Sequence, residues 1–240
     1  MEWWFDSSVL DDWTDGSSRT ELSPQEAKLK ERAEASQAHA EYRIKNHRGT
    51  YDQVDAILAL KRSMQTRLDH LDSIYGFKQY PQSRSAGWLG LLDEWGVIRK
   101  RVLRRMSQLR NAVEHDGAEP PGIDECEDYA EVNWWFLRAT TPLLRPMMDL
   151  SFSFEEYDLS LDFNYNPLLI KVRGNFLPEM LSDSELAGWI SVEAVVSEKR
   201  KSELASKLDH TEKEKLHLDG KTTTPESALP LIQRSFQEFI

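Results

Sequence analysis

The segment from Arg99 to Arg110 is a run of cationic side chains, and a histidine, His115, follows five residues after its end. Six of its twelve residues are basic and none is acidic, whereas the whole chain carries a formal charge of -11. At 100° per residue, one stripe of a helix would hold Arg101, Arg104, Gln108 and His115. Such a stripe favours phosphate binding, and an imidazole with an ordinary pKa of about 6.5 can transfer a proton beside it.

The basic run ends in Leu-Arg-Asn-Ala-Val-Glu-His-Asp-Gly, residues 109–117. An arginine followed at once by a polar residue, with a histidine five positions after the arginine in a long helix, resembles the signature of the HEPN superfamily. Many of its members are metal-independent RNases of toxin–antitoxin, abortive-infection and other antiphage systems. The resemblance covers about residues 21–147, and it implies that the catalytic residues are Arg110, Asn111 and His115.

The resemblance also implies the role of each residue. His115 would move a proton while a ribose 2′-hydroxyl attacks the adjacent phosphate, Arg110 would stabilise charge on the phosphorane, and Asn111 would orient one of them. This chemistry needs positioning and electrostatics but no metal or cofactor. Arg110 and His115 lie about 140° apart on a straight helix. Because the motifs of two subunits typically face each other in this family, we expect a homodimer with both residues at its interface.

Three other interpretations stay open. Glu114 can pair with Arg110 at i+4, His115 can interact with the helix C-terminal dipole, and Gly117 can cap the helix, so the segment can be purely structural. Alternatively, the chain is a non-catalytic module that binds RNA or a nucleotide. It can also be a subunit of a larger complex in which the basic helix and the tryptophan-rich N-terminal arm are protein interfaces.

Composition limits the protein class. With 240 residues, 40% of them hydrophobic, the chain can bury an ordinary core. Cys126 is the only cysteine, which excludes an intramolecular disulfide and a zinc cage of thiolates and favours a reducing compartment. No secretory signal or apolar run of about 20 residues is visible, so we expect a cytoplasmic protein that does not enter the membrane. The negative net charge predicts that any nucleic-acid site is local.

The spacing of apolar residues predicts the elements that would position the basic segment. Apolar positions recur every three or four residues in four stretches, which predicts helices at about 24–47, 51–74, 88–113 and 123–144. Short links join them, which is typical of an antiparallel four-helix bundle. His39, His47 and His70 fall in polar helical stretches and are expected at the surface.

The pattern changes after residue 147. Alternating apolar residues, and one apolar run at 168–172, predict strands, and a last helix is expected from Thr224. The predicted strands are 150–154, 157–165, 168–172 and 190–196. The predicted fold class is therefore α+β, mainly α, with a HEPN-like bundle followed by a small antiparallel sheet and a C-terminal helix. The expected domains are an aromatic and acidic arm at 1–20, the bundle at 21–147 and a small α+β domain at 148–240.

Together, these features predict a metal-independent endoribonuclease that acts in antiphage defence or as a toxin. The residues expected to guide the RNA substrate are Arg101, Arg104, Arg105 and Gln108, and this RNA can be tRNA or messenger RNA. An antitoxin or a sensor protein is a further expected partner. The C-terminal domain would gate activity, recognise a trigger or hold that partner.

Overall fold

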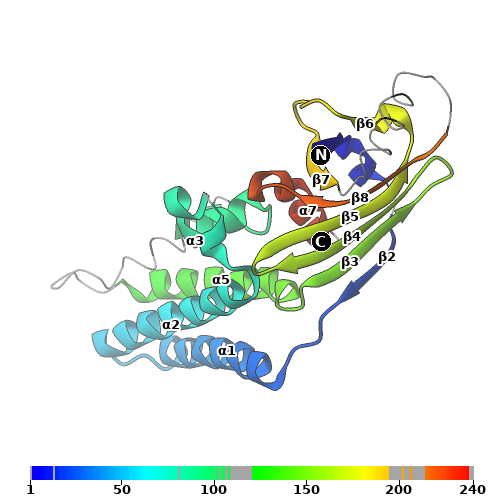
Figure 1. Ribbon diagram of the computed structural model, residues 1–240. Coiled ribbons are helices and arrows are strands. Elements are labelled where there is room, and N and C mark those ends of the chain that lie inside the picture. The colour runs from blue at the N-terminus through cyan, green and yellow to red at the C-terminus, as the bar shows by residue number, and fades with distance from the viewer. Residues whose placement is uncertain are drawn as a thin grey trace. The chain divides into compact units, whose positions relative to one another are not determined.

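The computed structural model describes residues 2–12, 14–80, 82–99, 101–102, 104–105, 108, 121–194, 202, 206 and 214–237. The chain forms two compact units. Residues 21–146 form a helical unit, and residues 1–20 join residues 147–240 in a sheet unit (Figure 1).

Three long helices make up most of the helical unit: α1 (Pro24–Lys45), α2 (Thr50–Tyr75) and α5 (Ile123–Thr140). Each packs against the other two, and they run side by side in Figure 1. α1 begins with a capping box between Ser23 and Glu26, and α2 ends at Gly76, whose left-handed backbone stops the helix. None of the described helices has the length and apolar character needed to span a bilayer.

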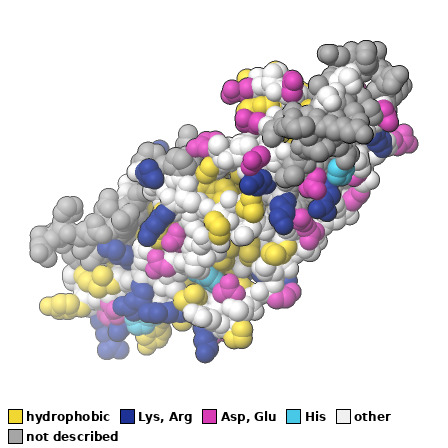
Figure 2. Space-filling view, viewed as in Figure 1, with side chains coloured by type: hydrophobic (Ala, Val, Ile, Leu, Met, Phe, Trp, Pro, Cys, Tyr) yellow, Lys and Arg dark blue, Asp and Glu magenta, His cyan; other side chains and the backbone are white. Residues whose placement is uncertain are grey.

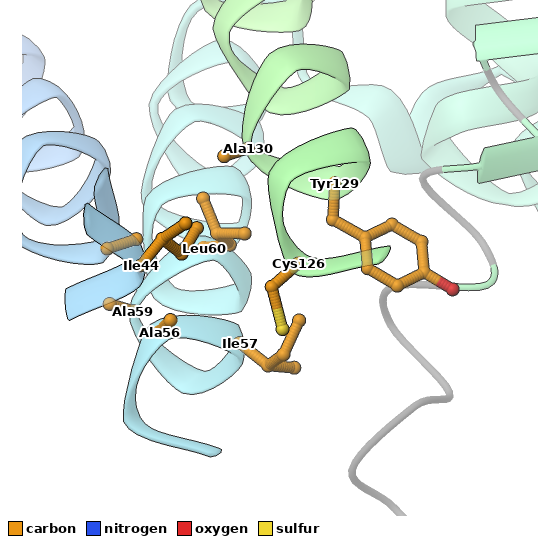
Figure 3. Close-up of a cluster of buried hydrophobic side chains, with 9 residues drawn as sticks. Ile44, Ala56, Ile57, Ala59, Leu60, Cys126, Tyr129 and Ala130 are labelled. Atoms are coloured by element: carbon orange, nitrogen blue, oxygen red, sulfur yellow. The ribbon is translucent and has the colours of Figure 1, made fainter. Parts of the chain in front are cut away.

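Small side chains let the three helices approach closely. Figure 3 shows Ala56, Ala59 and Ala130 where α1, α2 and α5 meet, together with larger apolar side chains around them. Leu60 and Ile57 of α2 are fully buried in this cluster, as is Cys126 of α5. Burial of each large aliphatic side chain contributes roughly 1.5–3 kcal/mol, so this cluster holds the three helices together.

The predicted continuous helix from residue 88 to residue 113 is wrong. The helix α3 spans Gln82–Glu94, bends at Gly87 (φ 68°) and ends just before Gly96 (φ 78°). The break lets Trp95 turn inward, where its ring packs edge-on against aromatic rings at centroid distances of 5.1–5.7 Å, those of Tyr75, Phe77 and Tyr80. Helical backbone is present again at residues 101–102, 104–105 and 108.

The sheet unit is built on one eight-stranded antiparallel sheet. Its strands are β1 (Glu2–Phe5), β2 (Thr14–Arg19), β3 (Met147–Ser153), β4 (Asp158–Tyr165), β5 (Leu168–Phe176), β6 (Leu181–Ser182), β7 (Ile190–Ala194) and β8 (Leu216–Thr222). They are ordered β2-β3-β4-β5-β8-β7-β1-β6. The helix α7 (Pro225–Gln237) packs against β5, β7 and β8.

The predicted fold class, a four-helix bundle followed by a small sheet, is therefore wrong. The sheet is large, and it is not confined to the C-terminal part of the chain, because β1 pairs with β7 and β2 pairs with β3. Trp3 and Phe5 point into the core of the sheet unit and are 2% and 0% exposed. These strands escape prediction because their hydrogen-bonding partners lie far away in the sequence, and Thr14–Arg19 has no apolar alternation.

Two glycines allow neighbouring strands of this sheet to come close. A Cβ on Gly174 of β5 would lie 2.3 Å from the carbonyl oxygen of Asp158, and one on Gly220 of β8 would lie 2.6 Å from that of Glu193. Any larger residue would push the strands apart. The core around them is apolar and includes the buried side chains of Leu150, Phe152, Leu159, Leu161 and Val172.

Candidate functional site

The three predicted catalytic residues, Arg110, Asn111 and His115, lie outside the described residues. The four residues predicted to guide RNA are described, and all have helical backbone: Arg101, Arg104, Arg105 and Gln108. Basic and acidic side chains are interspersed on the face drawn in Figure 2. In the sequence, the run of basic residues without acids is a local feature of a chain whose net charge is -11.

The arginines of the basic run differ in their surroundings. Arg101 and Arg104 are exposed, and neither is ion-paired with a residue in the described part of the chain. Arg105 is partly buried: its Nη1 donates to Oε1 of Gln108 at 3.3 Å, and its Nη2 lies 3.6 Å from Oδ2 of Asp128 on α5. Arg101 and Arg104 are therefore the better placed of the three to meet a phosphate.

The contact between Arg105 and Asp128 places Arg105 beside the first half of α5, which is acidic. That half carries Asp124, Glu125, Glu127, Asp128 and Glu131. On the same stretch, the hydroxyl of Tyr129 donates to Glu125 at 2.9 Å, and burial, reinforced by this carboxylate, raises the pKa of Tyr129 to about 12. Tyr129 therefore stays protonated at neutral pH, and the nearby carboxylates weaken the field of Arg105.

A second group of chemically capable side chains lies inside the helical unit. Of the eight buried polar or charged side chains in the described residues, six come from the facing sides of α1, α2 and α5. We call them the polar centre: Gln37, Ser63, Arg67, His70, Asn133 and Thr140. A buried polar group is costly unless it is hydrogen-bonded, so the partners of each decide what the centre can do.

One half of the polar centre is paired except for Oδ1 of Asn133, which has no partner in the described part of the chain. Asn133 Nδ2 donates to Oε1 of Gln37 at 2.7 Å and to Oγ of Ser63 at 3.0 Å. Gln37 Nε2 in turn donates to the carbonyl oxygen of Ala130 at 2.9 Å and to Oε1 of Glu41 at 2.7 Å. Ser63 donates to a backbone carbonyl of α1. This half joins the three helices in a fixed register.

Arg67 is fully buried, with 0% of its surface exposed. Its Nη1 lies within hydrogen-bond distance of three acceptors at the end of α5: the carbonyl oxygen of Leu137 (2.8 Å), Thr140 Oγ1 (2.9 Å) and Thr141 Oγ1 (3.2 Å). Desolvation lowers the pKa of Arg67 to about 10, and the charge of Glu34 opposes this shift. The guanidinium is therefore still a cation at neutral pH.

The other two nitrogens of Arg67, Nε and Nη2, have no hydrogen-bond partner in the described part of the protein. Their hydrogens point in the same direction and form the edge of the guanidinium that binds both oxygens of a carboxylate or phosphate. An unpaired cationic edge of this kind inside a core calls for an explanation.

His70 follows Arg67 by three residues on α2 and is 1% exposed, so the prediction that it lies at the surface is wrong. Neither of its ring nitrogens has a hydrogen-bond partner among the described residues. Desolvation lowers the pKa of His70, the charge of Arg67 lowers it further, and Glu26 acts in the opposite direction. His70 is therefore a neutral imidazole at neutral pH. His39, in contrast, is exposed and lies 3.2 Å from Asp55.

A groove of about 330 Å³ lies between α1 and α5. Gln37 of the polar centre lines it, as do Leu137 and Thr141, which both accept from Arg67. The groove therefore borders the polar centre. Its volume falls within the range of small-molecule sites, although at the lower end.

Charged and aromatic side chains surround this groove. On the α1 side, Lys30 Nζ lies 3.8 Å from Glu34 Oε1. On the α5 side, the guanidinium of Arg138 lies 4.9 Å from the ring centroid of Trp134, and that ring is 38% exposed. The groove thus offers two cations, two carboxylates (Glu34 and Glu41) and an accessible aromatic ring, so the charges of its lining balance.

Comparison with models of known protein families, with characterised proteins and with solved structures finds no match for this chain. The candidate sites therefore depend on their own residues. Within the described ranges, no three His, Cys, Asp or Glu side chains are grouped so that they could hold a metal ion.

The polar centre is absent from the sequence-based predictions, although α2 carries a signal for it. At 100° per residue, Ser63, Arg67 and His70 lie within about 80° of Leu60 around the helix axis. Polar residues that fall this close to the middle of an apolar stripe are expected to be buried. Only the packing of α1 and α5 onto α2 shows that all three are buried together.

Proposed function

We propose that this chain is a metal-independent endoribonuclease of the HEPN type, which acts as a homodimer in the cytoplasm. The observation that carries the proposal is the Arg-Asn-x-x-x-His sequence from Arg110 to His115, directly after a basic run in an acidic protein. The exposure of Arg101 and Arg104 supports it, because phosphate contacts need accessible cations.

In the proposed reaction, a ribose 2′-oxygen bonds to the adjacent phosphorus while the bond from phosphorus to the 5′-oxygen breaks. His115 of one copy accepts the 2′-hydroxyl proton, and the imidazolium of the same histidine in the second copy gives a proton to the leaving 5′-oxygen. Arg110 stabilises the added negative charge on the phosphorane. The products are a 2′,3′-cyclic phosphate and a 5′-hydroxyl, and no oxidant or cofactor is consumed.

Substrate RNA would bind through the basic run. Replacing Arg101 and Arg104 together with glutamine should weaken RNA binding and lower the dependence of log K on log salt by about 1–2, because up to two phosphate contacts and their released counterions are lost. Asp128→Asn should tighten RNA binding modestly, because it releases Arg105 from its carboxylate partner. A salt dependence that neither change alters would contradict this path for the RNA.

The decisive experiment incubates the purified protein with total RNA in EDTA and compares wild type with His115→Ala and Arg110→Ala. Wild type should release fragments with 5′-hydroxyl ends, which can be ligated and sequenced only by a method that accepts such ends. Both variants should release at least about 100-fold fewer, in line with the contribution of a general acid–base group. His39→Ala, which removes an exposed histidine of α1, is the matched control.

Two outcomes would overturn the proposal: cleavage that His115→Ala leaves unchanged, and cleavage that EDTA abolishes. RNA binding without cleavage by any preparation would favour the non-catalytic binding module instead. The proposed setting, a toxin or an antiphage system with an antitoxin or sensor partner, is supported by the resemblance of residues 109–117 alone.

A further inference from the structure

The turn that joins α1 to α2 belongs to a second basic stretch without acids. Residues 42–51 carry three Lys or Arg residues and no Asp or Glu. Two aromatic side chains bound this stretch and reach into solvent, since Tyr42 is 62% exposed and Tyr51 is 92% exposed. Tyr51 is the most exposed large apolar or aromatic side chain in the part of the chain that the structure describes. Cations interleaved with accessible rings are typical of surfaces that bind single-stranded nucleic acid.

The acids that α2 brings to this turn are already paired. Asp52 and Asp55 lie 3.2 Å and 2.6 Å from guanidinium nitrogens of Arg43. Asp52 also accepts from the backbone N–H of Arg48 at 2.8 Å. The side chains of Lys45 and Arg48, in contrast, are exposed and form no ion pair with a described residue. Two cations are therefore left for a ligand.

Hydrogen bonds hold the turn in one shape. Nδ2 of Asn46 donates to the carbonyl oxygen of Tyr42 at 2.8 Å, and the backbone N–H of His47 donates to that of Ile44 at 3.3 Å. Glu41, the residue before this stretch, lines the groove between α1 and α5. A ligand would therefore meet rings and cations on a backbone that is already ordered, so less conformational entropy is lost on binding.

The turn lies at the same end of the helical unit as Arg105 of the basic run. Ile44, near the end of α1, belongs to one core cluster with Cys126 and Tyr129 of α5, as Figure 3 shows. One residue before Tyr129, Asp128 lies 3.6 Å from Arg105. One strand of RNA across this end of the unit would therefore contact both the basic run and the turn.

We propose that the α1–α2 turn binds single-stranded RNA, with bases stacked on Tyr42 and Tyr51 and phosphates paired with Lys45 and Arg48. The inference deepens the proposed RNase function, on which it rests for the choice of RNA as the ligand. A duplex suits the turn less, because its paired bases offer no free face to a tyrosine. An anionic membrane also suits it less, because insertion needs an apolar face and the one aliphatic side chain of this stretch, Ile44, is buried.

Fluorescence anisotropy of a labelled oligouridine tests the proposal in the His115→Ala background, which prevents cleavage of the probe. The single strand should bind more tightly than its duplex with oligoadenylate. Tyr51→Ala should weaken binding about fivefold or more, whereas Tyr51→Phe, which keeps the ring, should not weaken it. Replacing Lys45 and Arg48 together with glutamine should reduce the slope of log K against log salt by about 1.4, the value for two phosphate contacts of a single strand.

The matched control is Arg62→Gln, which removes an exposed arginine of α2 three turns beyond Tyr51 and should leave that slope unchanged. All the substituted side chains of α1 and α2 are exposed, so these variants should fold. Circular dichroism and a melting curve verify that each does.

Three results would overturn the proposal: no binding of the oligouridine at low salt, equal binding of single strand and duplex, and equal binding by the parent and a folded Tyr51→Ala. Binding of phosphatidylglycerol vesicles that Tyr51→Ala abolishes, without RNA binding, would also overturn it and would assign the turn to a membrane.

The cleavage assay separates this inference from the proposed function. Absence of cleavage by wild type, with oligouridine binding that depends on Tyr51, would remove the RNase and leave the RNA site. Cleavage by wild type, with binding that none of the turn variants alters, would remove the RNA site and leave the RNase.

Discussion

The interiors of the two units differ in what they bury. In the sheet unit, Ser191 and Ser235 are buried among the described residues and each has a hydrogen-bond partner in its own unit, whereas Nε1 of the buried Trp3 has none. The helical unit buries six polar side chains at one interface, and three of them have polar atoms without any described partner: Arg67, His70 and, through Oδ1, Asn133. Among the described residues, the sheet interior thus leaves one neutral indole donor unpaired, whereas the helical interior leaves a guanidinium edge and a whole imidazole unpaired, which packing alone does not explain.

This difference singles out the helical unit as the place to look for function. Unpaired buried polar groups lower stability, so a sequence that keeps them either uses them or pairs them with something not present in the isolated chain. The comparison predicts that substitutions in the sheet core should be costly, whereas removal of the unpaired groups in the helical core should not.

The largest expected effect comes from Gly174→Ala in the sheet core. The new Cβ would lie 2.3 Å from the backbone oxygen of Asp158 and 2.9 Å from the ring of Phe176, so two strands must separate. We expect the free energy of unfolding to fall by about 3 kcal/mol or more. Urea denaturation followed by tryptophan fluorescence measures it.

The control lies in the same sheet. A Cβ on Gly16 of β2 would meet Ser151 Oγ at 3.4 Å, which is ordinary van der Waals contact. Gly16→Ala should therefore change stability by less than about 1 kcal/mol. If the two variants unfolded at the same urea concentration, close strand packing would not be what stabilises this unit.

The next effect is a dependence of stability on pH that comes from His70. The pKa of His70 is lowered in the folded protein by desolvation and by Arg67, so the unfolded chain binds a proton first as the pH falls. The free energy of unfolding should decrease below about pH 6.5, by at most about 1.4 kcal/mol per pH unit, and level off below the folded pKa. Above about pH 7.5 this group should contribute no slope.

Urea titrations at pH 7.5, 6.5 and 5.5 measure this dependence. His70→Gln should flatten the slope between the two lower values, whatever it does to stability at pH 7.5. If wild type and His70→Gln lost stability in parallel on acidification, His70 would take up a proton equally well in both states. Its side chain would then reach water, and the polar centre would be more open than its burial indicates.

Elements with local signals could be predicted from the sequence. The helices α1, α2 and α5 were expected at 24–47, 51–74 and 123–144, and the structure confirms their positions within a few residues. The strand β4 likewise follows the predicted alternation, and β5 contains the predicted apolar run 168–172 and extends it to Phe176. The spacing of apolar residues and the capping, glycine and proline residues at the ends of elements are properties of short segments, so one sequence is enough to detect them.

Features that depend on distant contacts could not be predicted. β1 and β2 are strands because β7 and β3 offer them free edges, and α3 ends early because Trp95 has an aromatic cluster to enter. The same holds for the candidate sites. The basic run could be recognised in the sequence. The polar centre, in contrast, exists only because Ser63, Arg67 and His70 of α2 pack against α1 and α5.

The smallest expected effect, and the sharpest test of the comparison, is Arg67→Met. The threonines that accept from Arg67 keep other partners, because Thr140 Oγ1 donates to the carbonyl oxygen of Phe136 at 2.7 Å and Thr141 Oγ1 to that of Leu137 at 2.7 Å. The substitution therefore leaves no hydroxyl unpaired and removes a buried charge. Stability should stay within about 1 kcal/mol of wild type or rise.

Leu60→Ala on the same helix supplies the contrast, since it empties a fully buried apolar site and should cost about 2–5 kcal/mol. Urea denaturation of both variants without ligand shows whether Arg67 contributes to the stability of the helical unit. A loss of 3 kcal/mol or more in Arg67→Met would mean that the bonds from Nη1 to the end of α5 hold the helices together. The polar centre would then stabilise the fold, as the apolar core of the sheet unit does, and its buried polar groups would not indicate a function.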